Sequence, residues 1–319
     1  MIAHTFVHAE EQTADLLRLL ERHAIKVQPG SVLEAMFLNV FNVSYRKAGE
    51  LAADRTADIR AHFSDFMGLT ELAGQLTRVA NMPGFNSLIP HLRLLNAPQP
   101  LQNRPSSALD QQSRKIFELL VATWAMNCGG DVELDNPDHS LGDNPDVLIT
   151  VDGRRWGFAC KVLQRFHAEG FLEHLRKGIA QIEASPAHVG AVVFNLKNVL
   201  EHNRYWRIVN EKEWESGAEP RFSCFEEPHA PYTLLKSELE AIGTKLREHA
   251  GQAPFAGCFT GDKTISGYLL WGHTTSAVLL DGVPTVAGVR CLNLQYVQPV
   301  TGWRLDALES LGRAAQTDH

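Results

Sequence analysis

Two short apolar segments joined by Asp152-Gly153 constrain the fold of this chain more than any other feature of its sequence. Residues 147–151 read VLITV and residues 154–163 read RRWGFACKVL. Such runs of β-branched and aromatic residues favour strands, and an Asp-Gly pair between two strands is typical of a two-residue hairpin turn. We therefore predict an antiparallel hairpin over residues 147–163, and the rest of the fold has to supply a sheet around it.

The segments on either side of the hairpin alternate between helical and strand patterns. Apolar residues at helical spacing predict a helix over 111–127, which Gly129 and Gly130 would end. The same spacing predicts a second helix over 171–184, and GAVVFNL at 190–196 is typical of a buried strand. The order helix, hairpin, helix, strand indicates a mixed α/β sheet with helices packed on it.

The regions before and after this middle segment differ in pattern. A Pro-containing stretch has loop composition, so we place a domain boundary near residue 105, between a helical N-terminal region (1–105) and the remainder (106–319). The C-terminal part is β-rich. The predicted segments are helices at 14–20, 32–45 and 57–79, an irregular stretch at 201–232, a helix at 233–250 and β-rich sequence at 255–300.

Charge and cysteine content exclude several classes of protein. The formal net charge is -7, so a uniformly basic surface is excluded and any phosphate contact has to come from a local patch. The five cysteines are scattered without metal-ligand spacing, so neither a zinc site nor a disulfide framework is indicated, and we expect a reducing cytoplasm. No run of about 18 apolar residues occurs, so we expect no membrane span and no membrane partner.

Polar residues in unusual positions mark a candidate site in the middle segment. Asp146 precedes the first strand of the hairpin, and Lys161 lies in the apolar returning strand. A buried ammonium is costly unless it is paired, so Lys161 should face a carboxylate, a phosphate or water. Glu118 is isolated in an apolar helix, and the three residues could converge where that helix crosses the hairpin. Carboxylates at a strand end suit Mg²⁺, which activates water for phosphodiester hydrolysis.

Four short motifs of the middle segment follow one another in a characteristic order. Glu118 lies in a helix, Pro145-Asp146 precedes a strand, Ala159-Cys160-Lys161 lies in the returning strand, and Gln181 lies in the next helix. This order resembles the PD-(D/E)xK nuclease superfamily, in its restriction-endonuclease-like, Mrr-like branch. The resemblance covers about residues 110–200. It implies a restriction-endonuclease-like mixed sheet flanked by helices, with an N-terminal helical region and a β-rich C-terminal extension.

The resemblance also implies an activity and roles for individual residues. It implies a Mg²⁺-dependent (or Mn²⁺-dependent) endonuclease that cleaves DNA, with RNA as the alternative substrate and bacterial defence or restriction as the expected role. Asp146, Glu118 and the backbone carbonyl of Cys160 would bind the metal. Lys161 would serve the attacking water, and Gln181 would orient site groups or the nucleic-acid backbone. Such nucleases often act as homodimers, although no dimer signal appears in this sequence.

Ala159 departs from the family pattern, which has Asp or Glu at this position. Alanine cannot bind a cation. One explanation is that another carboxylate replaces the acid, and the candidates near in sequence are Glu173, Glu183 and Asp143. The other explanation is a catalytically degraded protein that retains the fold as a DNA-binding or scaffold module.

Simpler interpretations of these residues remain open. Asn-Pro-Asp is turn-prone and occurs a second time at 136–138, so Asp146 could be a turn residue. Lys161 could extend its ammonium into solvent from an edge strand. The chain could also be an interaction protein whose N-terminal helical region docks a partner, which a large exposed apolar patch on residues 32–45 would support.

Overall fold

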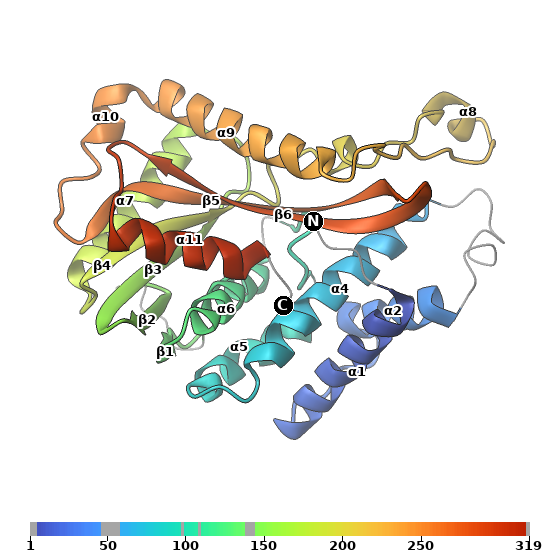
Figure 1. Cartoon of the computed structure of the whole chain (residues 1–319), viewed down its shortest axis with the longest axis horizontal. Helices are drawn as coiled ribbons and strands as arrows, with labels where there is room; N and C mark the ends of the chain where they lie inside the picture. Colours follow the sequence, from blue (N-terminus) through green and yellow to red (C-terminus); the bar gives the residue numbers. More distant parts are fainter. Residues whose placement is uncertain (1–4, 46–57, 97–98, 108–109, 138–143, 317–319) are drawn as a thin grey trace.

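One six-stranded mixed sheet carries helices on both of its faces (Figure 1). The computed structural model describes residues 5–45, 58–96, 99–107, 110–137 and 144–316. The strands follow one another in the sheet in the order of the sequence. They are β1 (Val132–Leu134), β2 (Val147–Val151), β3 (Arg154–Val162), β4 (Val189–Asn195), β5 (Thr264–Leu280) and β6 (Val283–Tyr296).

The strands β2 and β3 form the predicted hairpin, and β1 pairs antiparallel with the outer side of β2. The turn residues Asp152 and Gly153 have φ angles of 50° and 72°, the left-handed conformation that this two-residue turn requires. Val147 pairs with Phe158, so β3 continues past the start of β2 to Val162. The last residues of β3 therefore present a free edge on the β2 side.

The β-rich C-terminal part predicted at 255–300 forms two long strands, which make up one side of the same sheet. β4 pairs parallel with both β3 and β5, and β6 returns antiparallel along β5. The two long C-terminal strands thus continue the central sheet instead of forming an appendage to it. Their turn repeats the Asp-Gly chemistry of the first hairpin, with φ angles of 51° at Asp281 and 77° at Gly282.

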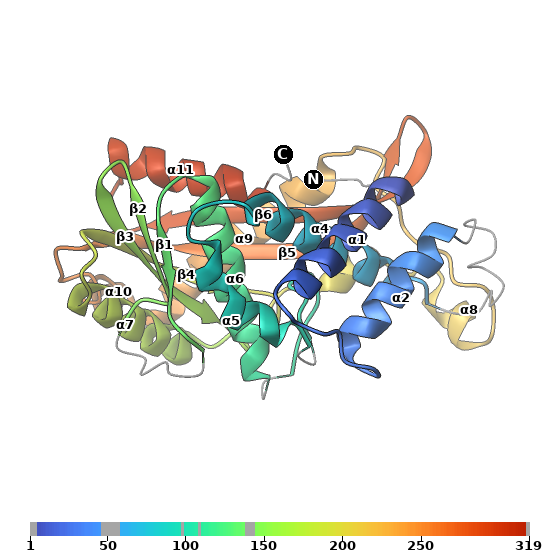
Figure 2. The ribbon, with the colours of Figure 1, turned by 90° about the horizontal axis from the view of Figure 1, so that it is seen from below.

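Two apolar clusters, one on each face of the sheet, hold the helices in place. Along β3, Phe158 and Cys160 belong to the cluster that includes α6, whereas Ala159 belongs to the cluster that includes α7. This alternation follows from the two-residue period of a strand, in which successive side chains point to opposite faces. Figure 2 shows α6 and α4 on the face of the sheet turned away from α9. One face carries α4 (Arg60–Val79), α6 (Gln111–Asn127) and α11 (Trp303–Gln316), and the other carries α7 (Ala168–Ala184) and α9 (Ala230–Ala250).

The N-terminal helices α1 (Phe6–Arg22) and α2 (Val32–Tyr45) pack on α4, which in turn packs on the sheet. A single apolar cluster includes Leu16 and Leu72 before residue 105 and Phe117 after it. Where α4 packs on the sheet, a carboxylate oxygen of Glu71 lies 2.6 Å from the ring nitrogen Nε2 of His273 in β5. The core is therefore continuous across the predicted domain boundary, and the division itself stays a prediction.

Several elements appear that the sequence patterns did not predict. β1 has only three residues, too few for an alternating pattern to emerge, and α11 lies beyond the segment that appeared β-rich. The mixed α/β sheet flanked by helices is nevertheless confirmed. The short helices are η1 (Phe85–Leu88), α5 (Ile89–Leu92), η2 (Arg93–Asn96), η3 (His202–Arg204), α8 (Glu211–Glu215) and α10 (Gln252–Ala256).

The exposed side chains of α2 test whether this helix offers a large apolar patch to a partner. Its residues Met36, Phe37 and Val40 are buried in the core. Among the described side chains of this helix, the large exposed apolar ones are Val32 and Leu38, which do not amount to a large patch. In the ranges that the structure describes, no helix is both long enough and apolar enough to cross a membrane.

Candidate active site

Three of the predicted site residues meet at the end of the β2–β3 hairpin that is remote from its turn. The Lys161 ammonium donates to Gln181 Oε1 at 2.8 Å and lies 3.4 Å from Asp146 Oδ2. The side chains of Asp146 and Lys161 are only 9% and 14% exposed. Lys161 is therefore a paired lysine in a largely buried setting, and the interpretation as a solvent-directed edge residue is wrong.

The free edge of β3 explains why Asp146 is held so firmly. The Cys160 N–H has no β2 partner and donates instead to Asp146 Oδ2 at 2.6 Å. In a strand the N–H and C=O of one residue point to the same edge, so the Cys160 carbonyl is directed to the side where Asp146 lies. Burial, reinforced by the charge of Asp146, raises the pKa of the Cys160 thiol, which stays protonated and buried.

Glu118 reaches the same point from the opposite face of the sheet. It lies in α6 with its side chain 6% exposed, and its carboxylate accepts from Lys115 Nζ at 2.9 Å. Burial, and then the negative charge of Asp146, raise the pKa of Glu118 well above its ordinary value, whereas Lys115 opposes the shift. Asp146 and Glu118 are thus two carboxylates that act on each other through a poorly hydrated region.

Two further groups, Lys115 and His91, contact Glu118, and neither was predicted from the sequence. Burial lowers the pKa of Lys115, but the attraction of Glu118 outweighs it, so the net shift is upward. His91 Nε2 lies 3.3 Å from Glu118 Oε2, and burial with the charge of Lys115 lowers the pKa of His91 to about 3. His91 is therefore neutral at pH 7, with Nε2 within hydrogen-bond distance of the Glu118 carboxyl group. The spacing of Lys115 three residues before Glu118 was a usable signal, but His91 lies far from both in sequence.

The side chain at position 159 lies in the apolar core, where neighbouring residues leave no free space. Ala159 is fully buried, and a Cβ built on Gly178 of α7 would lie 3.2 Å from its methyl group and 2.8 Å from Val192. The helix backbone therefore sits directly over this strand position, and a carboxylate could not be accommodated without moving α7.

None of the described replacement candidates supplies the missing acid. Glu173 pairs with Lys177 at 2.7 Å on the exposed side of α7, and this bond lowers the pKa of Glu173. Glu183 accepts from the backbone N–H and the hydroxyl of Thr264, at 2.8 and 2.7 Å. Asp143 lies outside the described residues.

Basic side chains surround the site on the α7 side. His174 is half-buried on the helix that carries Gln181, and burial together with the positive charge of Lys161 lowers its pKa. The charges of Lys177 and Arg114 act on His174 in the same direction. The site thus combines two carboxylates with a local cluster of cations, on a chain whose net charge is -7.

The oxygen groups present fit a magnesium ion. Among the described residues, no group of three or more His, Cys, Asp or Glu side chains could hold a metal by itself. Mg²⁺ does not need such a cage, because it is commonly bound through one or two carboxylates, waters and substrate phosphate. A divalent cation would also relieve the repulsion that raises the pKa of Glu118. Asp146, Glu118 and the Cys160 carbonyl are therefore a chemically suitable donor set.

No family model, curated protein or solved structure matches this chain. The arrangement of Asp146, Lys161, Gln181 and Glu118 is consequently what a functional assignment has to rest on.

Proposed function

We propose that this chain is a metal-dependent nuclease that hydrolyses phosphodiester bonds of DNA, on a restriction-endonuclease-like core formed by α6, β2, β3, α7 and β4. One observation carries the proposal. Glu118 lies in α6, Asp146 directly before β2, Lys161 in β3 and Gln181 in α7, yet they meet at one strand end from both faces of the sheet. A turn residue and a surface lysine would have no reason to share partners in this way.

The carboxylates of Asp146 and Glu118, with the carbonyl of Cys160, would hold the metal. Bound Mg²⁺ or Mn²⁺ polarises a phosphoryl oxygen and lowers the pKa of an attacking water. Lys115 and His91 keep Glu118 directed toward Asp146, since both contact its carboxyl group. The protein thus fixes its oxygen donors before the substrate arrives, which reduces the cost of reorganisation.

Lys161 supplies the positive charge of the site. The Lys161 ammonium donates a hydrogen bond to Gln181 Oε1 and is attracted by the carboxylate of Asp146. These two contacts fix the ammonium at the edge of the metal-binding groups. From there it offsets negative charge that develops on the phosphate and orients the water. Gln181 positions Lys161, and it is not required to touch the substrate in this role.

The substrate is a polyanion that the overall charge of the chain repels. Lys177 and Arg114, whose charges act on His174 together with that of Lys161, would provide a local positive region where phosphates are held. We propose DNA as the substrate and retain RNA as the alternative to be tested in the same assay.

Cleavage of supercoiled plasmid DNA with Mg²⁺ or Mn²⁺ tests the proposal. Asp146→Asn and Lys161→Met preserve side-chain size, and each should reduce the cleavage rate by about 100-fold or more. Glu133→Gln is the matched control, because this carboxylate is 66% exposed on the neighbouring strand β1. If the wild-type chain cleaves neither DNA nor RNA with either metal, the nuclease proposal is wrong.

The packing of Ala159 favours a second candidate, a DNA-binding module that has lost catalysis. The acid of the family pattern is replaced by a methyl group beneath Gly178, and the described residues offer no substitute. This candidate predicts salt-dependent binding of DNA without cleavage, and binding that Asp146→Asn leaves unchanged or strengthens.

A further inference from the structure

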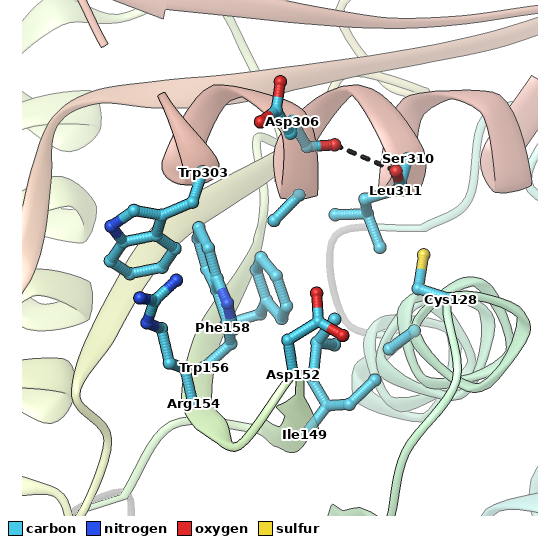
Figure 3. A pocket seen from close by; sticks show the side chains of 13 residues that line it. Cys128, Ile149, Asp152, Arg154, Trp156, Phe158, Trp303, Asp306, Ser310 and Leu311 are labelled. Atoms are coloured by element: carbon cyan, nitrogen blue, oxygen red, sulfur yellow. Dashed lines mark hydrogen bonds between the residues drawn. The ribbon is translucent and has the colours of Figure 1, made fainter. Parts of the chain in front are cut away.

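A cavity of about 220 Å³ lies at the turn end of the β2–β3 hairpin, away from Asp146. Figure 3 shows it between the hairpin, α6 and α11. Its floor is apolar, with Ile149 and Phe158 buried, whereas Asp152 and Trp303 at its mouth are exposed. The cavity is therefore open to solvent at the hairpin turn and enclosed by the core below.

Aromatic rings form its walls in two nearly perpendicular orientations. Trp156 and Phe158 are close to parallel, with an interplanar angle of 11° and ring centroids 6.0 Å apart. Trp303 meets Trp156 at 80° with centroids 5.6 Å apart. An aromatic ring carries partial negative charge on its faces and partial positive charge at its edges, so the ring faces that line the cavity favour a cation.

The charged groups at the mouth add to this preference. In Figure 3 the Asp152 carboxylate points into the cavity from the left-handed turn. Within the part of the chain that the structure describes, neither Asp152 nor the side chain of Asp306 has a hydrogen-bond or ion-pair partner. Arg154 also lines the cavity, where its guanidinium stacks on Trp303 at 4.0 Å from the ring centre and, among the described residues, forms no ion pair with either carboxylate. That stacking shows that this wall accepts a flat cation.

We propose that this cavity binds a small organic cation, either a flat amidinium or guanidinium on an apolar body or a methylated ammonium. A cavity of about 150 Å³ is sufficient to bind benzene, so the volume here accommodates one substituted ring. The aromatic walls would take the apolar body and part of the charge, and Asp152 would pair with the cationic head. The inference stands independently of the nuclease proposal, because it uses no residue of that site.

Calorimetric titration with two cations and their neutral counterparts tests the inference. Benzamidine is compared with benzamide, and tetramethylammonium with tert-butanol, on the full chain. At least one cation should bind about 10-fold tighter than its neutral counterpart. Which of the two binds distinguishes a flat cation from a methylated ammonium.

Two matched variants separate the cavity from general surface charge. Asp152→Asn keeps a residue that tolerates the left-handed turn, and it should reduce the affinity for the cation to that of the neutral compound. Asp281→Asn makes the same change in the same turn conformation of the β5–β6 hairpin, and it should leave the affinity unchanged. Equal affinity for charged and neutral compounds, no binding up to about 10 mM, or equal loss in both variants would overturn the inference.

Discussion

The two ends of the β2–β3 hairpin each carry an aspartate, and the surroundings of these two residues are opposite. Asp146 is 9% exposed, accepts the Cys160 N–H and faces Lys161. Asp152 is exposed in a left-handed turn, and its carboxylate points into an open cavity (Figure 3). One end is a closed polar cluster in which each group fixes the next, and the other is a pocket whose charges are available to a ligand.

The difference shows that residue type alone does not decide what a carboxylate does in this chain. A buried acid that holds a backbone N–H is part of the structure, and its removal leaves the donor without a partner. An exposed acid in a turn contributes little to stability and can be altered without cost elsewhere. Substitutions at the two ends should therefore differ in their effects on stability.

The largest difference is expected from introducing an acid at position 159. Ala159→Asp places a carboxylate in the core under Gly178, where it has no partner, and should reduce the free energy of unfolding by roughly 3–5 kcal/mol. Val151→Asp makes a comparable change beside the open cavity, where water reaches the half-buried side chain, and should cost far less. Urea unfolding of both variants measures this difference.

The same measurement shows whether position 159 is a lost metal site. Ala159→Asp restores the residue type of the family pattern. If this variant is as stable as the wild type and gains stability on addition of Mg²⁺, the packing argument is wrong and the position belongs to the metal site.

A smaller difference is expected from removing the two native aspartates. Asp146→Ala deprives the Cys160 N–H of its acceptor and Lys161 of its carboxylate, and should cost about 1–3 kcal/mol. Asp152→Asn keeps a residue that tolerates the left-handed turn and should stay within about 0.5 kcal/mol. Thermal and urea unfolding of the pair test this contrast, and equal losses would show that Asp146 is not a structural acceptor.

Much of the fold followed from local sequence patterns. The helix over 111–127 and the strand over 147–151 have the predicted limits, because the periodicity of apolar residues and the Gly and Asp-Gly signals agree there. The convergence of Glu118, Asp146 and Lys161 was expected from polar residues in apolar segments, and Gln181 was assigned to the same site by the resemblance. The pairing of strands that are distant in sequence was not predicted, because no local sequence pattern indicated that β5 would pair parallel with β4.

The parts of the site that escaped prediction depend on distant contacts. His91 reaches Glu118 because a short helical segment packs on α6, and a histidine in that segment carries no local signature. The aromatic cavity needs Trp303 of α11 to meet Trp156 of β3, residues separated by most of the second half of the chain. The close approach of Gly178 to Ala159 is likewise a contact between distant parts of the chain. The sequence shows only that the acid of the family pattern is missing at position 159.

The smallest expected effect is a change in the free energy of unfolding with each unit of pH, which arises from Glu118. Its pKa is raised in the folded chain above the ordinary 4.5 of the unfolded chain. Below pH 4.5 both states are protonated. As pH rises above this value, only the unfolded chain loses the proton, so stability falls until the pH passes the raised pKa. Relative to Glu118→Gln, which carries no charge, the wild type should lose at most about 1.4 kcal/mol per pH unit over this window.

Mg²⁺ should reduce the slope in the wild type, because a cation at Asp146 and Glu118 favours the ionised carboxylate. It should leave the slope of Glu118→Gln unchanged. Urea unfolding between pH 4 and 9, with and without Mg²⁺, measures both effects without relying on cleavage. A slope that Mg²⁺ does not alter would indicate that Glu118 is a buried acid held only by Lys115 and His91, and that the metal, if bound, is held elsewhere.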